Sequence, residues 1–320
     1  MYQSSCSSLR DVDFSPVASG GSRLAVLAAL VANSTIAVAK FVAFLITGSA
    51  AMLAECIHSV ADSSNQGLLL YGGRAARQPA DVSHPFGRGK EVYFWGFLVA
   101  VMLFFGGGVW EFVHGWEAIG HAEPLGDLTP SFIVLGVALV LESISFGVAL
   151  REFNRYRGTK PMWRAIRESK DASLIVILLE DTAAMLGLIF ALAGTAMASA
   201  TGDSRWDGAA SLLIGVMLAV VAVLLAAEIK ALLIGEAAGR RERALIRAVL
   251  LGMDEVTGVG RLLTMHLGPD DLLVNVEVDF IESLGTTEIA DAITNAEQAI
   301  RDKIPVAGNI FVEPYDRDAI

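Results

Sequence analysis

Six long apolar runs fill most of the first 235 residues, with short polar connections between them. Each run is long enough for the roughly 20 residues that a helix needs to cross the hydrocarbon core of a bilayer. The runs cover residues 24–46, 50–72, 94–118, 131–150, 172–198 and 208–233. The pattern therefore predicts six transmembrane helices, which would leave both ends of the chain on one side of the membrane.

Lysine and arginine are distributed unevenly over the connections between these runs. The connections 73–93 and 151–171 together hold 11 of these residues, whereas the connections on the opposite side hold only Arg205. Basic loops are retained in the cytoplasm during membrane insertion. We therefore expect these two connections, and both ends of the chain, to be cytoplasmic.

After Ile234 the long apolar runs give way to shorter amphipathic elements. Their periodicities predict, in order, a helix, two strands, a second helix and a third strand. The expected ranges are 242–253, 260–267, 272–280, 286–303 and 309–312. We therefore expect a cytoplasmic tail (1–22), a six-helix transmembrane domain (23–235) and a small α+β cytoplasmic domain of αββαβ order (236–320).

Composition agrees with this division: 54% of the residues are hydrophobic, 18% are charged and the mean hydropathy is +0.54, as in integral membrane proteins. From Glu236 onward there are 16 acidic and 8 basic residues, so the predicted soluble domain is acidic. No basic footprint for nucleic acid is present, which argues against that partner. The two cysteines, Cys6 and Cys56, are not placed to form a disulfide framework or a thiolate metal site.

The second run carries ionisable residues in its middle. Glu55, His58 and Asp62 fall within about 60° of one another on a helix of about 100° per residue. Each such group costs roughly 2.5 to 3.5 kcal/mol at membrane depth, a cost usually tolerated only for a pathway or a partner. This helix face is therefore a candidate cation site, and a polar seam that joins helices is the alternative.

A second acidic pair, Glu180 and Asp181, lies inside the fifth run. Adjacent carboxylates near a helix start often serve only as an amino-terminal cap. At 1.5 Å per residue, however, Asp181 lies roughly 15 Å from one end of its helix and Asp62 roughly 18 Å from the opposite end of its own. Both would be near the bilayer midplane, so His58, Asp62 and Asp181 could form one metal site, with Glu180 or Glu55 as a fourth ligand.

Imidazole and carboxylate together suit Zn²⁺, and a larger share of carboxylates favours harder ions such as Mn²⁺ or Fe²⁺. Because imidazole must be neutral to bind a metal, binding would release a proton and couple the two fluxes. Other polar residues lie in the runs, and helix pairing or snorkelling explains them as well as a proton path does. They are Asn33, Lys40, Glu111, His114 and Glu142.

Several motifs occur in the order typical of one transporter family. They are HSVAD (58–62), DVSHPFGRGKE (81–91), an acidic fifth helix and FVEP (311–314). In these motifs the chain resembles the cation diffusion facilitators over nearly its whole length past residue 23. SKDAS (169–173) and LLEDTAAMLG (178–187) are similar to the branch that includes the mitochondrial zinc transporter-like proteins.

The resemblance implies a transporter rather than an enzyme, with no cofactor beyond the transported cation. It implies a homodimer with a metallochaperone-like cytoplasmic domain that exports Zn²⁺ or a related ion in exchange for protons by alternating access. His58, Asp62 and Asp181 match three of the usual ligands, whereas Ile177 stands where the family usually has a fourth ligand.

A second metal site in the first cytoplasmic loop of some relatives corresponds here to Asp81, His84 and Arg88. Because arginine cannot ligate a metal, we expect no metal there and expect Arg88 or Lys90 to pair with an acidic group. In the cytoplasmic domain His266 is the one imidazole, and a lone histidine on a strand is more often structural than a ligand.

Two other functions stay open at this point. The lost ligand and the lost loop site fit a non-transporting partner subunit of a metal transporter. A membrane metalloenzyme is the second rival, but the chain has no HExxH motif. The polar start of the chain does not resemble a secretory signal, and we expect the protein in a bacterial inner membrane.

Overall fold

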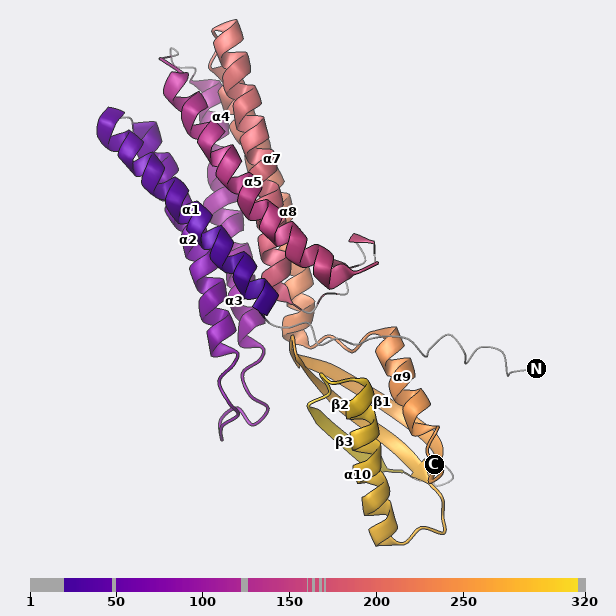
Figure 1. Cartoon of the computed structure of the whole chain (residues 1–320). Helices are drawn as coiled ribbons and strands as arrows, with labels where there is room; N and C mark the ends of the chain where they lie inside the picture. Colours follow the sequence, from indigo (N-terminus) through magenta and orange to yellow (C-terminus); the bar gives the residue numbers. More distant parts are fainter. Residues whose placement is uncertain are drawn as a thin grey trace, which may run out of the picture. The chain divides into compact units, whose positions relative to one another are not determined.

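The computed structural model describes residues 20–47, 50–121, 126–159, 161–162, 165–166, 169 and 171–315. Contacts divide the chain into two compact units, with the boundary between Ile234 and Gly235. The first unit is a bundle of long helices and the second is a small domain with a three-stranded sheet (Figure 1).

Long helices form the first unit, and their bounds extend beyond most ends of the predicted apolar runs. They are α1 Gly20–Thr47, α2 Ala50–Ala75, α3 Glu91–Met102, η1 Leu103–Val109, α4 Trp110–Gly120, α5 Thr129–Arg157, α7 Ala172–Thr201 and α8 Arg205–Ile234. The segments α3, η1 and α4 follow one another without a break, so the described residues of this unit form six long helical stretches. Figure 1 shows these stretches side by side in the bundle.

Within the described residues, four of these stretches are long and apolar enough to cross a membrane, and α1 has a shorter apolar stretch at Val26–Val42. The four are Glu91–Gly120, Thr129–Arg157, Ala172–Thr201 and Arg205–Ile234. The helix α2 is less apolar because Asp62, Asn65 and Gln66 lie within it. The protein is a multi-pass integral membrane protein.

The larger apolar cluster described in the bundle lies at one end of the helices. Tyr93 at the start of α3, Phe153 at the end of α5, Ile175 near the start of α7 and Ile229 near the end of α8 are almost fully buried in one cluster. Leu69, near the end of α2, belongs to the same cluster. The charged connections 76–90 and 158–171 join the helices at this same end.

The stretch η1 is a seven-residue π-helix with the sequence LFFGGGV, which the apolar pattern does not predict. A Cβ atom added at Gly108 would lie 2.9 Å from the backbone nitrogen of Ala219 in α8. One added at Gly115 would meet the backbone of Leu212, and one at Gly215 the backbone of Phe112. Glycine therefore lets α4 and α8 pack backbone against backbone, as small residues do in membrane helix pairs.

The second unit contains α9 Arg240–Leu250, β1 Val256–Gly268, β2 Asp271–Phe280, α10 Thr286–Lys303 and β3 Asn309–Pro314. The strands lie in the order β1-β2-β3, with β1 antiparallel and β3 parallel to β2.

Alternate residues of β2 lie in the apolar core of this unit. Leu272, Val274, Val276 and Val278 are fully buried, and they share a cluster with apolar residues of α9 and α10. The first strand begins at Val256 rather than at residue 260, because the ladder to β2 continues through register irregularities as far as Phe280. The helix α9 ends at Leu250, three residues before its predicted end.

Candidate cation site in the helix bundle

Glu180 joins α7 to α2 through two amide side chains. Asn65 Nδ2 donates to Glu180 Oε1 at 2.9 Å, and Gln66 Nε2 donates to Glu180 Oε2 at 3.2 Å. All three side chains are buried. Hydrogen bonds to both oxygens compensate for the removal of this carboxyl group from water.

The neighbouring Asp181 faces a different helix. Its Oδ2 accepts a hydrogen bond from Ser145 Oγ of α5 at 3.0 Å, and the residue is 2% exposed. Successive residues of a helix point about 100° apart. The adjacent carboxylates therefore contact opposite sides of the bundle interior, α2 for Glu180 and α5 for Asp181.

These contacts also show which residues of α5 and α7 lie at the same level, that is, at the same position along the bundle axis. Ser143 Oγ lies 3.6 Å from Met185 Sδ, while Ser145 lies opposite Asp181, so the two helices are antiparallel. Glu142, three residues before Ser145, is therefore opposite Ala184, about 4.5 Å along the axis from Asp181 at 1.5 Å per residue.

The helix α2 is antiparallel to α7 as well. Asn65 contacts Glu180, and Leu69, one turn further along α2, shares an apolar cluster with Ile175 and Ile177, which precede Glu180. Asp62, one turn before Asn65 and Gln66, therefore lies at the level of Ala184, which is also the level of Glu142. The charges of Asp62, Asp181 and Lys40 all act on Glu142.

Of the three predicted ligands on α2, the structure describes the side chain of only one. Asp62 is half-buried, whereas the side chains of Glu55 and His58 lie outside the described residues. Among the side chains that the structure describes, no three from His, Cys, Asp and Glu are close enough together to hold one metal ion. Ile177, at the position of the usual fourth ligand, is completely buried in the apolar core.

Sequence reasoning gave no specific role to four residues that surround the acidic ones. Asn65 and Gln66 hold Glu180, Ser145 holds Asp181, and Glu142 is buried within electrostatic reach of both aspartates. The spacing of Glu142 and Ser145 was the available signal, because residues at i and i+3 share a helix face. Which helix that face meets depends on packing and cannot be read from one helix alone.

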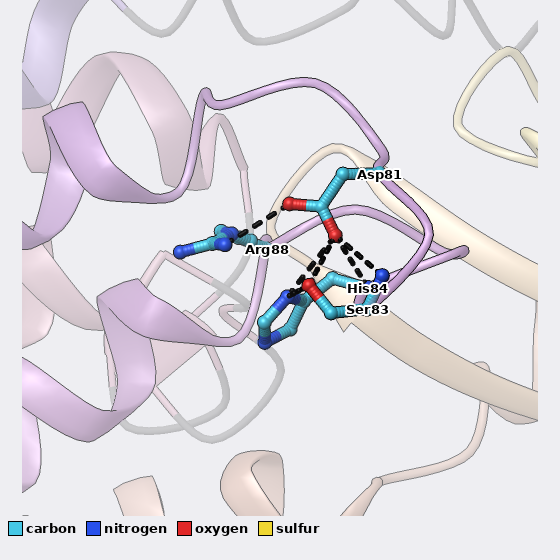
Figure 2. Close-up of polar contacts among 4 residues, drawn as sticks. All are labelled: Asp81, Ser83, His84 and Arg88. Carbon is cyan, nitrogen blue, oxygen red and sulfur yellow. Dashed lines mark hydrogen bonds and ion pairs between the residues drawn. The ribbon is translucent and has the colours of Figure 1, made fainter.

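The loop between α2 and α3 forms a compact turn around Asp81. Figure 2 shows one oxygen of Asp81 facing Arg88 and the other facing Ser83 and His84. Arg88 Nη2 lies 3.0 Å from Oδ2, and Oδ1 accepts hydrogen bonds from Ser83 N, Ser83 Oγ and His84 N at 2.6 to 2.8 Å. The Ser83 side chain and then Arg88 hold the pKa of Asp81 well below its ordinary value.

His84 Nδ1 is 3.4 Å from Asp81 Oδ1 and 3.1 Å from Ser83 Oγ, so it belongs to the same turn. A metal at Asp81 would have to displace the guanidinium of Arg88 and several hydrogen-bond donors. In the second unit, His266 is 3% exposed on β1, and its backbone nitrogen donates to the carbonyl oxygen of Glu236 at 2.9 Å. His266 is therefore buried rather than at the surface of this unit.

Comparison with known proteins adds to this geometry. Residues 26–234 match the cation efflux transmembrane domain. The human mitochondrial proton-coupled zinc antiporter SLC30A9 is 33% identical over 257 residues, which are 80% of this chain and 45% of that protein. Metal tolerance protein C4 of Arabidopsis thaliana is 28% identical over 265 residues, 81% of this chain and 57% of that protein.

A bacterial relative aligns over more of its own length. The cation-efflux pump FieF of Yersinia enterocolitica is 27% identical over 286 residues, which are 89% of this chain and 90% of that protein. The chain thus spans about half the length of SLC30A9 and of protein C4, and most of the length of FieF. By its matched domain and these relatives, the chain belongs to the cation efflux family, the cation diffusion facilitators.

Proposed function

We propose that this protein exports divalent cations in exchange for protons by alternating access, with Zn²⁺ as its first substrate. The observation that carries the proposal is the pair of aspartates on two helices, Asp62 on α2 and the buried Asp181 on α7, about one turn apart in level. The similarity to SLC30A9, a proton-coupled zinc antiporter, supports Zn²⁺ and proton coupling, and the similarity to FieF, a cation-efflux pump, supports cation efflux.

In this proposal His58, Asp62 and Asp181 bind the cation. His58 is four residues before Asp62 in the sequence, a spacing that favours one helix face for both ligands. The cation enters from the cytoplasm and displaces the proton of the imidazolium to that same side, because only the neutral imidazole binds a metal; a proton from the opposite side returns after the cation has left. Glu180 supports α7 through Asn65 and Gln66 rather than binding the cation, which leaves Glu55 as the other candidate on α2.

We further propose six membrane spans, with the two basic connections and both chain ends in the cytoplasm. The second unit would be a metallochaperone-like domain through which two chains form a homodimer. The FieF relatives, which are bacterial and align over most of their length, support a bacterial cell membrane as the location. The loop at Asp81 and His84 would be a structural turn without metal.

A second candidate function is a partner subunit that does not transport by itself. Two observations favour it: Ile177 is buried in the apolar core where the family usually has a ligand, and Arg88 neutralises Asp81 in the loop. Such a subunit would bind metal weakly and need another chain for activity.

Proteoliposomes that contain the full chain would test the proposal. We expect Zn²⁺ uptake with counterflow of protons, and complete loss of both in Asp62→Ala and Asp181→Ala. Glu152→Ala is the matched control, because Glu152 is also a carboxylate of the bundle but pairs with Arg155 at the end of α5. Zn²⁺ uptake that stays unchanged when the proton gradient is collapsed would refute the proton coupling. If the wild-type chain takes up no ion, the result would favour the partner-subunit function.

A further inference from the structure

We infer that Glu142 of α5 is a fourth ligand of the transported cation, an inference that rests on the proposed transport function. The site would then include three helices, α2, α5 and α7, instead of two. Its ligand set would be His58, Asp62, Asp181 and Glu142, one nitrogen donor and three carboxylates. Such a set accepts Zn²⁺ and also suits the harder ions Mn²⁺ and Fe²⁺.

The levels of the helices place Glu142 beside the two aspartates. Asp62 and Glu142 both lie opposite Ala184 of α7, and Asp181 is one turn away. Ser145, on the same face of α5 as Glu142, already contacts Asp181 at 3.0 Å. The face of α5 that carries Glu142 is therefore the face turned toward the proposed ligand on α7.

The burial of Glu142 indicates that its carboxylate has a function in the bundle. The residue is 7% exposed, and its Oε2 has no hydrogen-bond partner among the described residues. A buried oxygen of this kind normally finds a donor or an ion. Glu180 differs, because both of its oxygens already accept hydrogen bonds from amides.

The charges of the site balance when a cation is bound. Three carboxylates carry about −3, and a divalent ion with the ammonium group of Lys40 supplies about +3. Lys40 is buried on α1, and its charge acts on Glu142. No three of the described carboxylates lie close enough together to hold one ion in this conformation, so binding would require α5 to move relative to α2 and α7. A ligand on α5 would thereby link ion binding to a movement of that helix.

Calorimetric titration of the purified full chain with ZnCl₂, together with Zn²⁺ uptake into proteoliposomes, tests the inference. We expect Glu142→Gln to weaken Zn²⁺ binding at least about tenfold, since loss of even a residue that only supports a ligand costs 10- to 100-fold. Glu152→Gln makes the same chemical change on the same helix and should leave binding unchanged.

A second variant covers the case in which Glu142→Gln does not yield folded protein. Glu142→His keeps a ligand at this position, and it should retain Zn²⁺ binding while it loses Mn²⁺ binding relative to wild type. The inference would be overturned if Glu142→Gln bound Zn²⁺ as tightly as wild type, or if Glu142→His kept the ion preference of wild type. Zn²⁺ uptake by the wild-type chain in the same experiments would leave the transport function intact. If Glu142→Gln bound Zn²⁺ more weakly but the wild-type chain took up no Zn²⁺, the result would support Glu142 as a ligand and refute the proposed transport function.

Discussion

Two pairs of helices in the bundle contact each other in different ways. At the contact of α4 with α8, glycines allow backbone to meet backbone, with Gly115 against Leu212 and Gly215 against Phe112. At the contact of α2 with α7, long amide side chains reach across to Glu180. At its glycines the first contact leaves no space for a side chain, whereas the second consists of side chains that can change partners.

This difference separates structural support from function. Lipid is as apolar as the helix surfaces, so helices associate through close packing and interhelical hydrogen bonds. The glycine contact relies on close backbone packing, and it suits a pair of helices that stays fixed. The polar contact lies beside Asp62, Glu142 and Asp181, where a transporter needs helices that rearrange when an ion binds or leaves.

The largest effect should come from adding bulk at the glycine contact. Gly115→Leu or Gly215→Leu would force α4 from α8, because the added atoms meet backbone that cannot move aside. Overpacking costs about 1 to 3 kcal/mol even among movable side chains, so we expect loss of folded protein by size-exclusion chromatography in detergent. Gly136→Leu is the control, because a Cβ there meets nothing within 4 Å; an equal loss in this variant would contradict the account.

Restoring a histidine in the loop should have the next largest effect. Arg88→His removes the ion pair of Asp81 and completes the Asp, His, His pattern of the relatives that bind a second metal there. We expect the number of Zn²⁺ ions bound per chain to rise by about one, as measured by metal analysis after gel filtration. Arg88→Gln breaks the same ion pair without supplying a ligand, and an equal rise in that variant would refute this explanation.

The polar contact should contribute a smaller and measurable energy. A double-mutant cycle of Asn65→Ala and Glu180→Ala isolates the hydrogen bond between these residues. Such bonds between membrane helices average about 0.6 kcal/mol and reach about 1.7 kcal/mol, so the coupling should fall in this range by equilibrium unfolding in detergent. A coupling of zero would mean that the contact does not stabilise the bundle.

The smallest effect concerns the protonation of Asp81. Its pKa is lowered in the folded protein, so its ionised form stabilises the fold above the ordinary pKa of aspartate, and this contribution is lost as pH falls through the lower folded value. Ser83→Ala removes the hydroxyl donor and should raise the pKa of Asp81 toward its ordinary value, as followed by NMR. Ser64→Ala removes a hydroxyl from α2 and is the control; an unchanged pKa in Ser83→Ala would contradict the assigned cause.

Much of the fold follows from local patterns in the sequence. The apolar runs correspond to the long helical stretches, and the range 286–303 matches α10 at both ends. The end of α5 at Arg157 lies seven residues past the apolar run, because Arg155 and Glu152 continue the helix as a charged pair. The π-helix at Leu103–Val109 has no such local signal.

The candidate site was only partly predictable. Asp62 and Asp181 stand out in the sequence because charges are rare in apolar runs. The partners of Glu180 and the surroundings of Glu142 depend on how α2, α5 and α7 are rotated against one another. A single sequence fixes which residues share one helix face, but not which helix that face meets.

The most direct test of the central claim compares the neighbouring carboxylates of α7. Zn²⁺-driven proton flux would be measured in proteoliposomes with wild type, Asp181→Asn and Glu180→Gln, each checked for folding. The account predicts flux in wild type and in Glu180→Gln, with none in Asp181→Asn, because Asp181 binds the ion while Glu180 holds α2. Flux that survives in Asp181→Asn, or that is lost only in Glu180→Gln, would contradict it.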